Sequence, residues 1–261
     1  MLIDLTDKTA LITGSTLGIG YAAAAGLHAS GANVVINGRN QERVQEAVER
    51  LGGDDRVRGI AADVGTAEGC QTLTNAVPDV DILVNNAGVF VPQPVFEIPD
   101  EEWERLFAVN VMSGVRLSRH YMPGMVTRGW GRVVFVSSES ALHIPKEMVH
   151  YGTTKLAQLG VARGLAESVS GSGVTVNSIL PGPTRSEGLE VFLGQMVGNG
   201  VASVEEAGHL LIERERPTSL LGRLASSEEV ANLIVYLSSE QASATTGSSL
   251  RVDGGVVRAV A

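Results

Sequence analysis

Tyr151 and Lys155 are the two residues of this chain best suited to chemistry, because they stand four positions apart, and Ser138 precedes the tyrosine by thirteen. On a helix, residues i and i+4 share a face, and a nearby ammonium favours the phenolate form of a tyrosine. A free phenol titrates near a pKa of about 10, so a lowered pKa would make Tyr151 a general acid/base for a carbonyl/alcohol pair. An ordinary helical pair is the alternative, because this spacing is common by chance.

The elements that would position these residues alternate along the chain. Apolar segments expected to be strands lie at Thr9–Thr13, Asn33–Asn37, Val57–Ala62, Asp81–Val84, Arg132–Val136, Val174–Ile179 and Ser248–Val252. Helical patterns lie at Gly18–Ala29, Gln41–Leu51, Ala67–Val77, Glu101–Val126 and Tyr151–Ser168, and capping-box patterns at Ser203 and Ser226 open two more helices. Apolar strands separated by helices predict a doubly wound α/β fold, with a parallel sheet covered on both faces, in a single domain over residues 1–261.

The least regular region is Leu180–Gly222, which contains Pro181-Gly182-Pro183, four glycines between Ser186 and Gly200, and a charged run, Glu213–Arg216. An insertion of this kind in a compact domain is usually functional or mobile. It follows a strand end, where ligands bind in open α/β sheets. We therefore expect a mobile substrate lid at about residues 180–222, with a decorative surface excursion as the alternative.

Composition excludes several classes of function. The 261 residues carry a net charge of −9 and a pI near 5.1, which argues against general binding to nucleic acid or an anionic membrane. No apolar run is long enough to span a bilayer, and Met1 leads directly into an expected strand rather than a signal peptide. The single cysteine, Cys70, indicates a reducing compartment and is expected to be a packed side chain rather than a catalytic thiol. A cytoplasmic protein is the expectation.

A glycine-rich turn follows the first expected strand, where Gly14, Gly18 and Gly20 give the spacing Gly-x3-Gly-x-Gly. Such a turn lets the backbone approach a pyrophosphate, and the following helix supplies free N–H groups and a favourable dipole. Three glycines alone are weak evidence in a chain with 31 of them, but their place at the first strand–helix junction predicts a dinucleotide site. Ser15 and Thr16 within the turn offer further hydrogen bonds.

The second strand ends in Asn37-Gly38-Arg39, where an NAD site usually places an acid for the ribose hydroxyls. No acid is present, and Arg39 can pair with a 2′-phosphate, which predicts NADP with NAD used less efficiently. A solvated surface arginine is the alternative. Asp63 after the third strand is expected to accept a hydrogen bond from the adenine, and the amides of Asn85-Asn86-Ala87-Gly88 to lock neighbouring turns.

Together these motifs resemble the short-chain dehydrogenase/reductase family, over Asp7 to about Gly255. The matching residues are Gly14, Gly18, Gly20, Asp63, Asn85-Asn86-Ala87-Gly88, Asn110, Ser138, Tyr151, Lys155 and Pro181-Gly182. The resemblance implies a Rossmann-like oxidoreductase in which Tyr151 is the acid/base and Lys155 lowers its pKa and holds the nicotinamide ribose. Ser138, selected over Ser137 by its spacing, would bind the substrate carbonyl, and Asn110 would help hold a water linked to Lys155.

The cofactor contacts that follow are expected at Gly14, Ser15, Thr16, Gly18, Ile19, Gly20, Arg39, Asp63, Val64, Asn86, Ala87, Gly88, Tyr151, Lys155, Pro181, Gly182 and Thr184. The substrate pocket is expected near Glu139, Leu142, Ile144, Met148 and Val149. His143 and His150 flank this segment without metal-ligand spacing, so no metal site is expected, and His150 is expected to be a partly buried residue at a helix start.

The resulting prediction is an oxidoreductase that transfers a hydride between NADP(H) and a ketone/alcohol pair. The substrate is a 3-oxoacyl compound or a small free carbonyl compound, and the alternative is a catalytically silent dinucleotide-binding regulator. The intact Ser138, Tyr151 and Lys155 argue against the regulator. Small residues on the helix after Tyr151, from Ala157 to Gly164, together with the family resemblance, predict a homo-oligomer, most simply a tetramer. Packing of this small face on the subunit's own sheet is the alternative.

Overall fold

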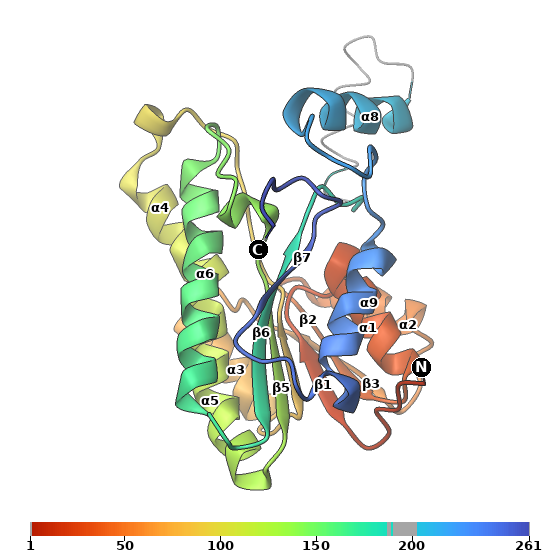
Figure 1. Cartoon of the computed structure of the whole chain (residues 1–261). Helices are drawn as coiled ribbons and strands as arrows, with labels where there is room; N and C mark the ends of the chain where they lie inside the picture. Colours follow the sequence, from red (N-terminus) through yellow and green to blue (C-terminus); the bar gives the residue numbers. More distant parts are fainter. Residues whose placement is uncertain (1, 187–188, 190–202, 261) are drawn as a thin grey trace.

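The computed structural model describes residues 2–186, 189 and 203–260, and these form a seven-stranded parallel sheet in the order β3-β2-β1-β4-β5-β6-β7 (Figure 1). The strands are β1 (Thr9–Ile12), β2 (Asn33–Gly38), β3 (Val57–Ala61), β4 (Ile82–Asn85), β5 (Gly131–Val136), β6 (Val174–Pro181) and β7 (Ser249–Val252). Strand order reverses between β1 and β4, and ligands of open α/β sheets bind at such a point. The predicted doubly wound fold is confirmed.

Two hydrophobic cores lie on opposite faces of this sheet, because successive strand residues point to opposite sides. On β1, Ala10 and Ile12 belong to one core and Leu11 to the other. The first core is covered by α1 (Gly18–Ala29), α2 (Gln41–Arg50) and α9 (Ser227–Leu237), and the second by α3 (Ala67–Ala76), α5 (Ser113–Arg128) and α6 (Val149–Ser168) (Figure 1). The inner strands β4, β5 and β6 are therefore buried along their whole length, as expected for a sheet covered on both faces.

The helix expected over Glu101–Val126 is not continuous. It divides into α4 (Asp100–Phe107), a π-helical turn η2 (Ala108–Met112), and α5. A π turn adds one residue to a helical turn and is common at functional sites. This turn contains Asn110, which is buried, so the irregularity coincides with a residue that the sequence placed in the site.

The region after β6 is described only in part. Residues 187–188 and 190–202 lie outside the described residues, and the middle of the predicted lid falls on them. Its later part forms α8 (Val204–Glu215), which Figure 1 shows beyond the edge where β6 ends. Ser203 accepts a hydrogen bond from the Glu206 N–H, and Ser226 forms the full capping box with Glu229 that starts α9. None of the described helices is both long and apolar enough to cross a membrane.

Candidate active site

The turn between β1 and α1 requires glycine for two separate reasons. Gly14 and Gly18 have φ values of 60° and 56°, in the left-handed region that other residues rarely adopt. Gly20 has no such φ, but a Cβ there would lie 2.4 Å from the Asn86 amide nitrogen and 2.5 Å from the Gly14 carbonyl oxygen. Neighbouring residues thus pack closely against one side of the turn. Only the other side of its backbone is available to a ligand.

Short polar side chains hold this turn in place. The Asn86 amide donates to the carbonyl oxygens of Thr13 (2.8 Å) and Gly14 (2.9 Å), and the Thr13 hydroxyl accepts from the N–H groups of Asn86 and Ala87. Asn37, at the end of β2, donates to the carbonyls of Ile60 and Ala62, both at 3.2 Å. The expectation that the Asn85–Gly88 amides lock neighbouring turns is confirmed for Asn86. The part played by Asn37 was not foreseen.

Ser15 differs from expectation. Its side chain is fully buried, donates to the Ile12 carbonyl at 2.7 Å and accepts from the Asn37 N–H at 3.0 Å. Its own N–H donates to the Asn37 carbonyl. Because these groups are committed to the protein, Ser15 shapes the turn from behind and its hydroxyl is not directed at a ligand.

Around Thr16 the turn meets the end of β2. A Cβ on Gly38 would lie 2.7 Å from the Thr16 methyl carbon, so Thr16 occupies the space that a side chain at position 38 would need. The Arg50 guanidinium donates to the Thr16 carbonyl at 2.8 Å and stacks on the Tyr21 ring. Arg39 directly follows β2 and is exposed, so its guanidinium is accessible to a ligand from solvent.

The remaining predicted cofactor residues lie at the same edge of the sheet. Asp63 is exposed after β3 and accepts from the Gly65 N–H at 3.0 Å, while the neighbouring Val64 is buried. After β6, Gly182 packs against Asp253 so closely that a Cβ would meet its carbonyl oxygen at 2.5 Å. Thr184 donates to the Gly182 carbonyl and pairs with Ala225 as a parallel bridge. Ile19 is half-buried at the start of α1.

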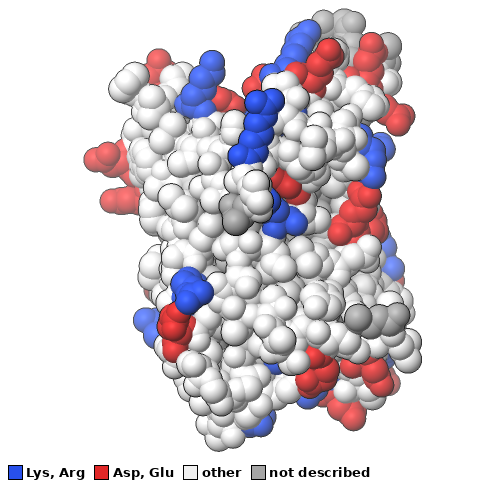
Figure 2. All heavy atoms as spheres, viewed as in Figure 1, with Lys and Arg blue, Asp and Glu red and all other residues white. Residues whose placement is uncertain are grey.

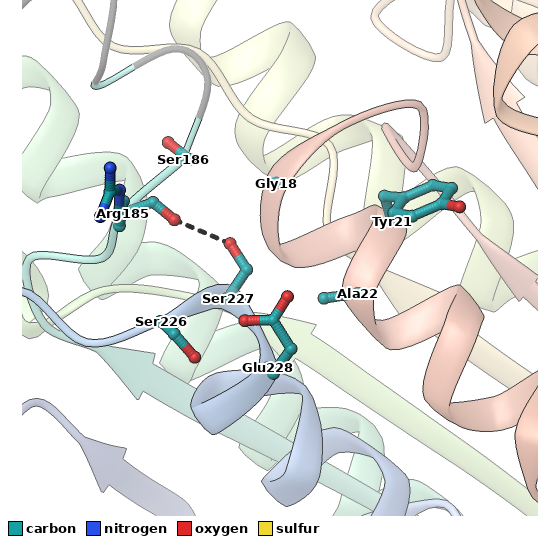
Figure 3. Close-up of a pocket in the computed structure, with 8 residues that line it drawn as sticks. All are labelled: Gly18, Tyr21, Ala22, Arg185, Ser186, Ser226, Ser227 and Glu228. Carbon is teal, nitrogen blue, oxygen red and sulfur yellow. Dashed lines mark hydrogen bonds between the residues drawn. The ribbon is translucent and has the colours of Figure 1, made fainter. Parts of the chain in front are cut away.

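A cavity of about 260 Å³ opens beside the turn, between the starts of α1 and α9 (Figure 3). Its lining residues are Gly18, Tyr21, Ala22, Arg185, Ser186, Ser226, Ser227 and Glu228. The Ser227 hydroxyl donates to the Arg185 carbonyl at 2.9 Å, so the segment after β6 is tied to the start of α9 (Figure 3). This cavity lies next to Gly18 and is not lined by Ser138 or Tyr151. The candidate catalytic side chains therefore lie outside it.

Ser138 and Tyr151 meet at the carboxyl end of β5. Ser138 caps the short helix η3 (Glu139–Ala141), accepts from the Ser140 N–H at 3.1 Å, and lies close enough to Tyr151, in the first turn of α6, to lower the pKa of its hydroxyl. Ser137 instead donates to the Lys155 carbonyl at 2.8 Å and so holds the α6 backbone. The two neighbouring serines therefore have different partners, and Ser138 is the one beside the tyrosine, as its spacing predicted.

The electrostatics of Tyr151 are opposite to the expectation that Lys155 lowers its pKa. Burial, and to a smaller extent the Glu139 charge, raise the pKa of Tyr151 to about 12, while Ser138 and Arg216 oppose the rise. Lys155 is buried, its amine donates to the Val136 carbonyl at 2.9 Å, and it lies 5.6 Å from the centre of the tyrosine ring. Burial lowers the pKa of Lys155 to about 7, so its positive charge is itself destabilised here.

Asn110 connects three parts of the site from within the π turn. Its side chain accepts from the Val89 N–H at 2.8 Å and donates to the Val89 carbonyl and the Thr154 hydroxyl. Its backbone carbonyl accepts from the Gln158 amide at 2.6 Å. A Cβ on Gly88 would lie 3.3 Å from the Lys155 amine and 3.6 Å from the Asn110 side-chain oxygen. Glycine at position 88 therefore keeps the space between them open.

Two features near Tyr151 were missed. The Phe90 ring makes an edge contact with the Tyr151 ring at 5.9 Å, and an aromatic residue two positions after the Asn85–Gly88 motif was the signal that could have revealed it. Glu139, expected only as a pocket neighbour, forms a buried ion pair with Arg216 at 2.8 Å. No local pattern connects two residues 77 positions apart.

Two other residues singled out in the sequence, His150 and Cys70, are packed in the protein interior. His150 is fully buried rather than partly buried, and its ring contacts Trp103 of α4 at 5.8 Å. Burial lowers the pKa of His150. Cys70 is buried, donates to the Val64 carbonyl and has a pKa raised by burial, which argues against a reactive thiolate. Over the described ranges, no group of His, Cys, Asp and Glu has the arrangement of a metal site.

Known proteins match this chain along its whole length. Residues 8–192 match the model of the short chain dehydrogenase family. An uncharacterized oxidoreductase of Bacillus subtilis, YvaG, is 46% identical, with both chains covered completely. A 3-oxoacyl-[acyl-carrier-protein] reductase of Rickettsia felis is 30% identical over 98% of this chain and 99% of its own. The crystal structure of L-sorbose reductase from Gluconobacter frateurii, complexed with NADPH and L-sorbose, superposes with a TM-score of 0.93 at 32% identity over all of both chains. With this coverage, and with the glycine turn and the Ser138–Tyr151 contact at the end of the sheet, the chain belongs to the short-chain dehydrogenase family of oxidoreductases.

Proposed function

We propose that this protein interconverts a ketone or aldehyde and the corresponding alcohol with NADP(H). The observation that supports the proposal most directly is the position of Ser138 beside Tyr151 and a buried Lys155, at the sheet edge that also carries the glycine turn. A protein that only bound the dinucleotide would have no use for a paired acid and carbonyl-binding hydroxyl. The catalytically silent regulator therefore has no support from these residues.

The site fits a nicotinamide dinucleotide by the shape of its backbone. Gly14 and Gly20 leave no room for a Cβ against Ala87 and Asn86, so the main chain itself forms the surface that a pyrophosphate would meet. The bound nicotinamide supplies or accepts the hydride. The protein residues would hold it: the glycine turn at the pyrophosphate, Lys155 and Tyr151 at the nicotinamide ribose, and Thr184 near the amide or pyrophosphate.

The proton chemistry is assigned to three side chains. In reduction, the Tyr151 hydroxyl gives its proton to the substrate oxygen, and the Ser138 hydroxyl donates a hydrogen bond that stabilises the developing negative charge. Asn110 is assigned the task of holding a water that links Lys155 to solvent. Burial raises the pKa of Tyr151 to about 12, so this hydroxyl stays protonated near neutral pH and the proton that it gives is present.

The preference for NADP rests on the end of β2. Arg39 is exposed and permanently charged, and no carboxylate stands at positions 37–39 to repel a 2′-phosphate. Thr16 fills the space beside Gly38, so an acidic side chain there would require the turn to move. L-sorbose reductase, which superposes over the full length, is complexed with NADPH. NADH is expected to serve at lower efficiency.

Two substrate classes are represented among proteins at about 30% identity to this chain. L-sorbose reductase is complexed with L-sorbose, a small free carbonyl compound, and the Rickettsia felis relative is a 3-oxoacyl-[acyl-carrier-protein] reductase. A direct test is to incubate the purified protein with a panel of ketones, 3-oxoacyl thioesters and alcohols and to follow NADPH or NADH by absorbance. We expect turnover of at least one carbonyl class, faster with NADPH. If no compound of the panel is turned over with either cofactor, although both bind, the regulator would have to be reconsidered.

A homo-oligomer is proposed from the outer face of α6. Gly160 and Gly164 are exposed, and a Cβ at either position would meet nothing within 4 Å, so this small face does not pack on the subunit's own sheet. Leu156 is also exposed there, and Figure 2 shows a broad uncharged area over this side of the molecule. Two such faces can approach closely in a tetramer. Light scattering that gives a monomer at micromolar concentration would refute this assembly.

A further inference from the structure

Glu139 is a buried carboxylate with one unused oxygen. Its side chain is 4% exposed, and Oε1 accepts from the Arg216 guanidinium at 2.8 Å. Oε2 is buried as well, yet it has no hydrogen-bond partner among the described residues. Burying a charged oxygen is costly unless it is paired or hydrogen-bonded. A pair that served only the fold would be expected to satisfy both oxygens.

The position of the pair is as informative as its burial. Glu139 immediately follows Ser138 in the chain, and both Glu139 and Arg216 are close enough to Tyr151 for their charges to act on its hydroxyl. A substrate oxygen held by Ser138 and Tyr151 would therefore be within the electrostatic range of the Glu139 carboxylate, which adjoins Ser138 in the chain.

Arg216 reaches the site from the other side. It directly follows α8, where its N–H donates to the Ile212 carbonyl and its guanidinium also donates to the Glu215 carbonyl at 2.8 Å. These contacts fix the guanidinium against one carboxylate oxygen only. The second oxygen has no donor among the residues that the structure describes.

We propose that Glu139 is a specificity-determining residue whose Oε2 accepts a hydrogen bond from a hydroxyl group next to the substrate carbonyl, and that Arg216 is the positioning residue that holds the Glu139 side chain in place. The substrate class is then a hydroxylated ketone or aldehyde, such as a polyol-derived ketone, rather than a plain acyl chain. This inference rests on the proposed carbonyl/alcohol function. A substrate hydroxyl supplies the missing donor, whereas a methylene group in its place would leave Oε2 buried and unpaired.

The test compares two substrates that differ in one hydroxyl group, 1-hydroxybutan-2-one and butan-2-one. For each, kcat/KM is measured with NADPH, and the ratio of the two values is the readout. The wild-type protein is expected to favour the hydroxylated ketone. The double variant Glu139→Leu/Arg216→Met removes both charges together, so no buried charge is left without a partner. In this variant the ratio is expected to fall by about tenfold to a hundredfold.

Two further variants separate recognition from structure. Arg216→Met alone keeps the acceptor but removes its positioning partner, so the ratio should fall by less than in the double variant. Arg56→Gln disrupts the ion pair with Asp54, at the start of β3 and the opposite edge of the sheet, and should leave the ratio unchanged. Thermal unfolding and NADPH binding, followed by fluorescence, verify that each variant is folded.

The outcomes are distinct. A fall in the ratio for the double variant, with no change for Arg56→Gln, supports the assignment. If the ratio is unchanged in the double variant, including when kcat/KM falls equally for both ketones, the ion pair is structural and the assignment is overturned. A wild-type preference for butan-2-one also overturns the assignment. If the wild-type protein reduces no carbonyl compound at all, the proposed function itself fails, and the inference falls with it.

Discussion

The cofactor half and the substrate half of the site are held together in different ways. Around the glycine turn, short polar side chains such as Thr13, Asn37 and Asn86 bind backbone groups on neighbouring strands. Around Tyr151, long side chains from distant parts of the chain meet, with Glu139 and Arg216 forming a buried ion pair. The first half is a backbone surface and the second is an arrangement of charges.

This difference has consequences for how each half can vary. A short side chain loses little rotational freedom when it bonds to the backbone, and it tolerates almost no change of size. A buried ion pair is sensitive to which charges are present and can be exchanged for another pair or for apolar residues. We therefore expect the cofactor half to fail through steric changes and the substrate half through changes of charge or proton.

The largest effect should come from removing the proton donor. Tyr151→Phe keeps the ring, its contact with Phe90 and the packing of α6, but it removes the hydroxyl. Turnover should fall by about 10²- to 10⁴-fold, the usual contribution of a general acid. NADPH affinity, measured by fluorescence titration, should stay within a few-fold of wild type because the cofactor half is intact. Substantial turnover by the purified variant would refute the assigned role.

The next largest effect is expected from a steric change in the cofactor half of the site. Gly20→Ala places a Cβ 2.4 Å from the Asn86 amide nitrogen, so the turn must move. We expect the affinities for NADPH and NADH to fall together by more than about tenfold, since the lost contacts are with the shared pyrophosphate. Gly124→Ala in α5 is the matched control, because its added carbon would meet only the side-chain ends of Arg128 and Asp79, at 3.1 and 3.2 Å. Normal cofactor binding by Gly20→Ala would show that the backbone cradle is misplaced.

A smaller and more selective effect is expected at Arg39. A partly exposed, charge-assisted contact with a 2′-phosphate is worth roughly 1.5–3 kcal/mol. Arg39→Ala should therefore weaken NADPH about tenfold to a hundredfold and leave NADH almost unchanged, as measured by isothermal titration calorimetry. Arg43→Ala, which removes an exposed arginine from α2, serves as the control. A higher catalytic efficiency of the wild-type protein with NADH would contradict this interpretation of β2.

The smallest effect is expected from replacing Lys155, which lies between the two halves, and it is a change in thermal stability. Burial lowers the pKa of Lys155 to about 7, well below its unfolded value, so the cost of burying its charge is complete below pH 7 and is relieved as pH rises above it. Lys155→Met should raise the Tm of the cofactor-free protein, by more at pH 6 than at pH 9, although it destroys activity. Each 1 kcal/mol corresponds to about 2–4 °C in a protein of this size.

Differential scanning calorimetry at the two pH values measures this shift, and Lys146→Met provides the control. Lys146 is exposed in the loop before α6, so its replacement should not alter Tm in a pH-dependent way. A Tm of Lys155→Met that lies below wild type at both pH values would mean that the Val136 hydrogen bond outweighs the cost of burial.

Sequence spacing was sufficient for much of the site. It placed the glycine turn at the first strand–helix junction and gave the strands within one or two residues. These succeed because they depend on local periodicity and on the absence of a Cβ. The direction of the Ser15 hydroxyl could not be predicted, because a serine in a turn can face either the ligand or the sheet.

The sequence by itself determined the alternating order of strands and helices, the glycines that a Cβ would exclude, and the types of residue available for acid/base chemistry. Only the tertiary structure decided the π turn at Asn110, the meeting of Glu139 with Arg216, and the direction in which the pKa of Tyr151 moves. The reason is physical: a helix or a turn is specified by neighbours a few residues apart, whereas burial and charge depend on groups that come together only when the chain folds.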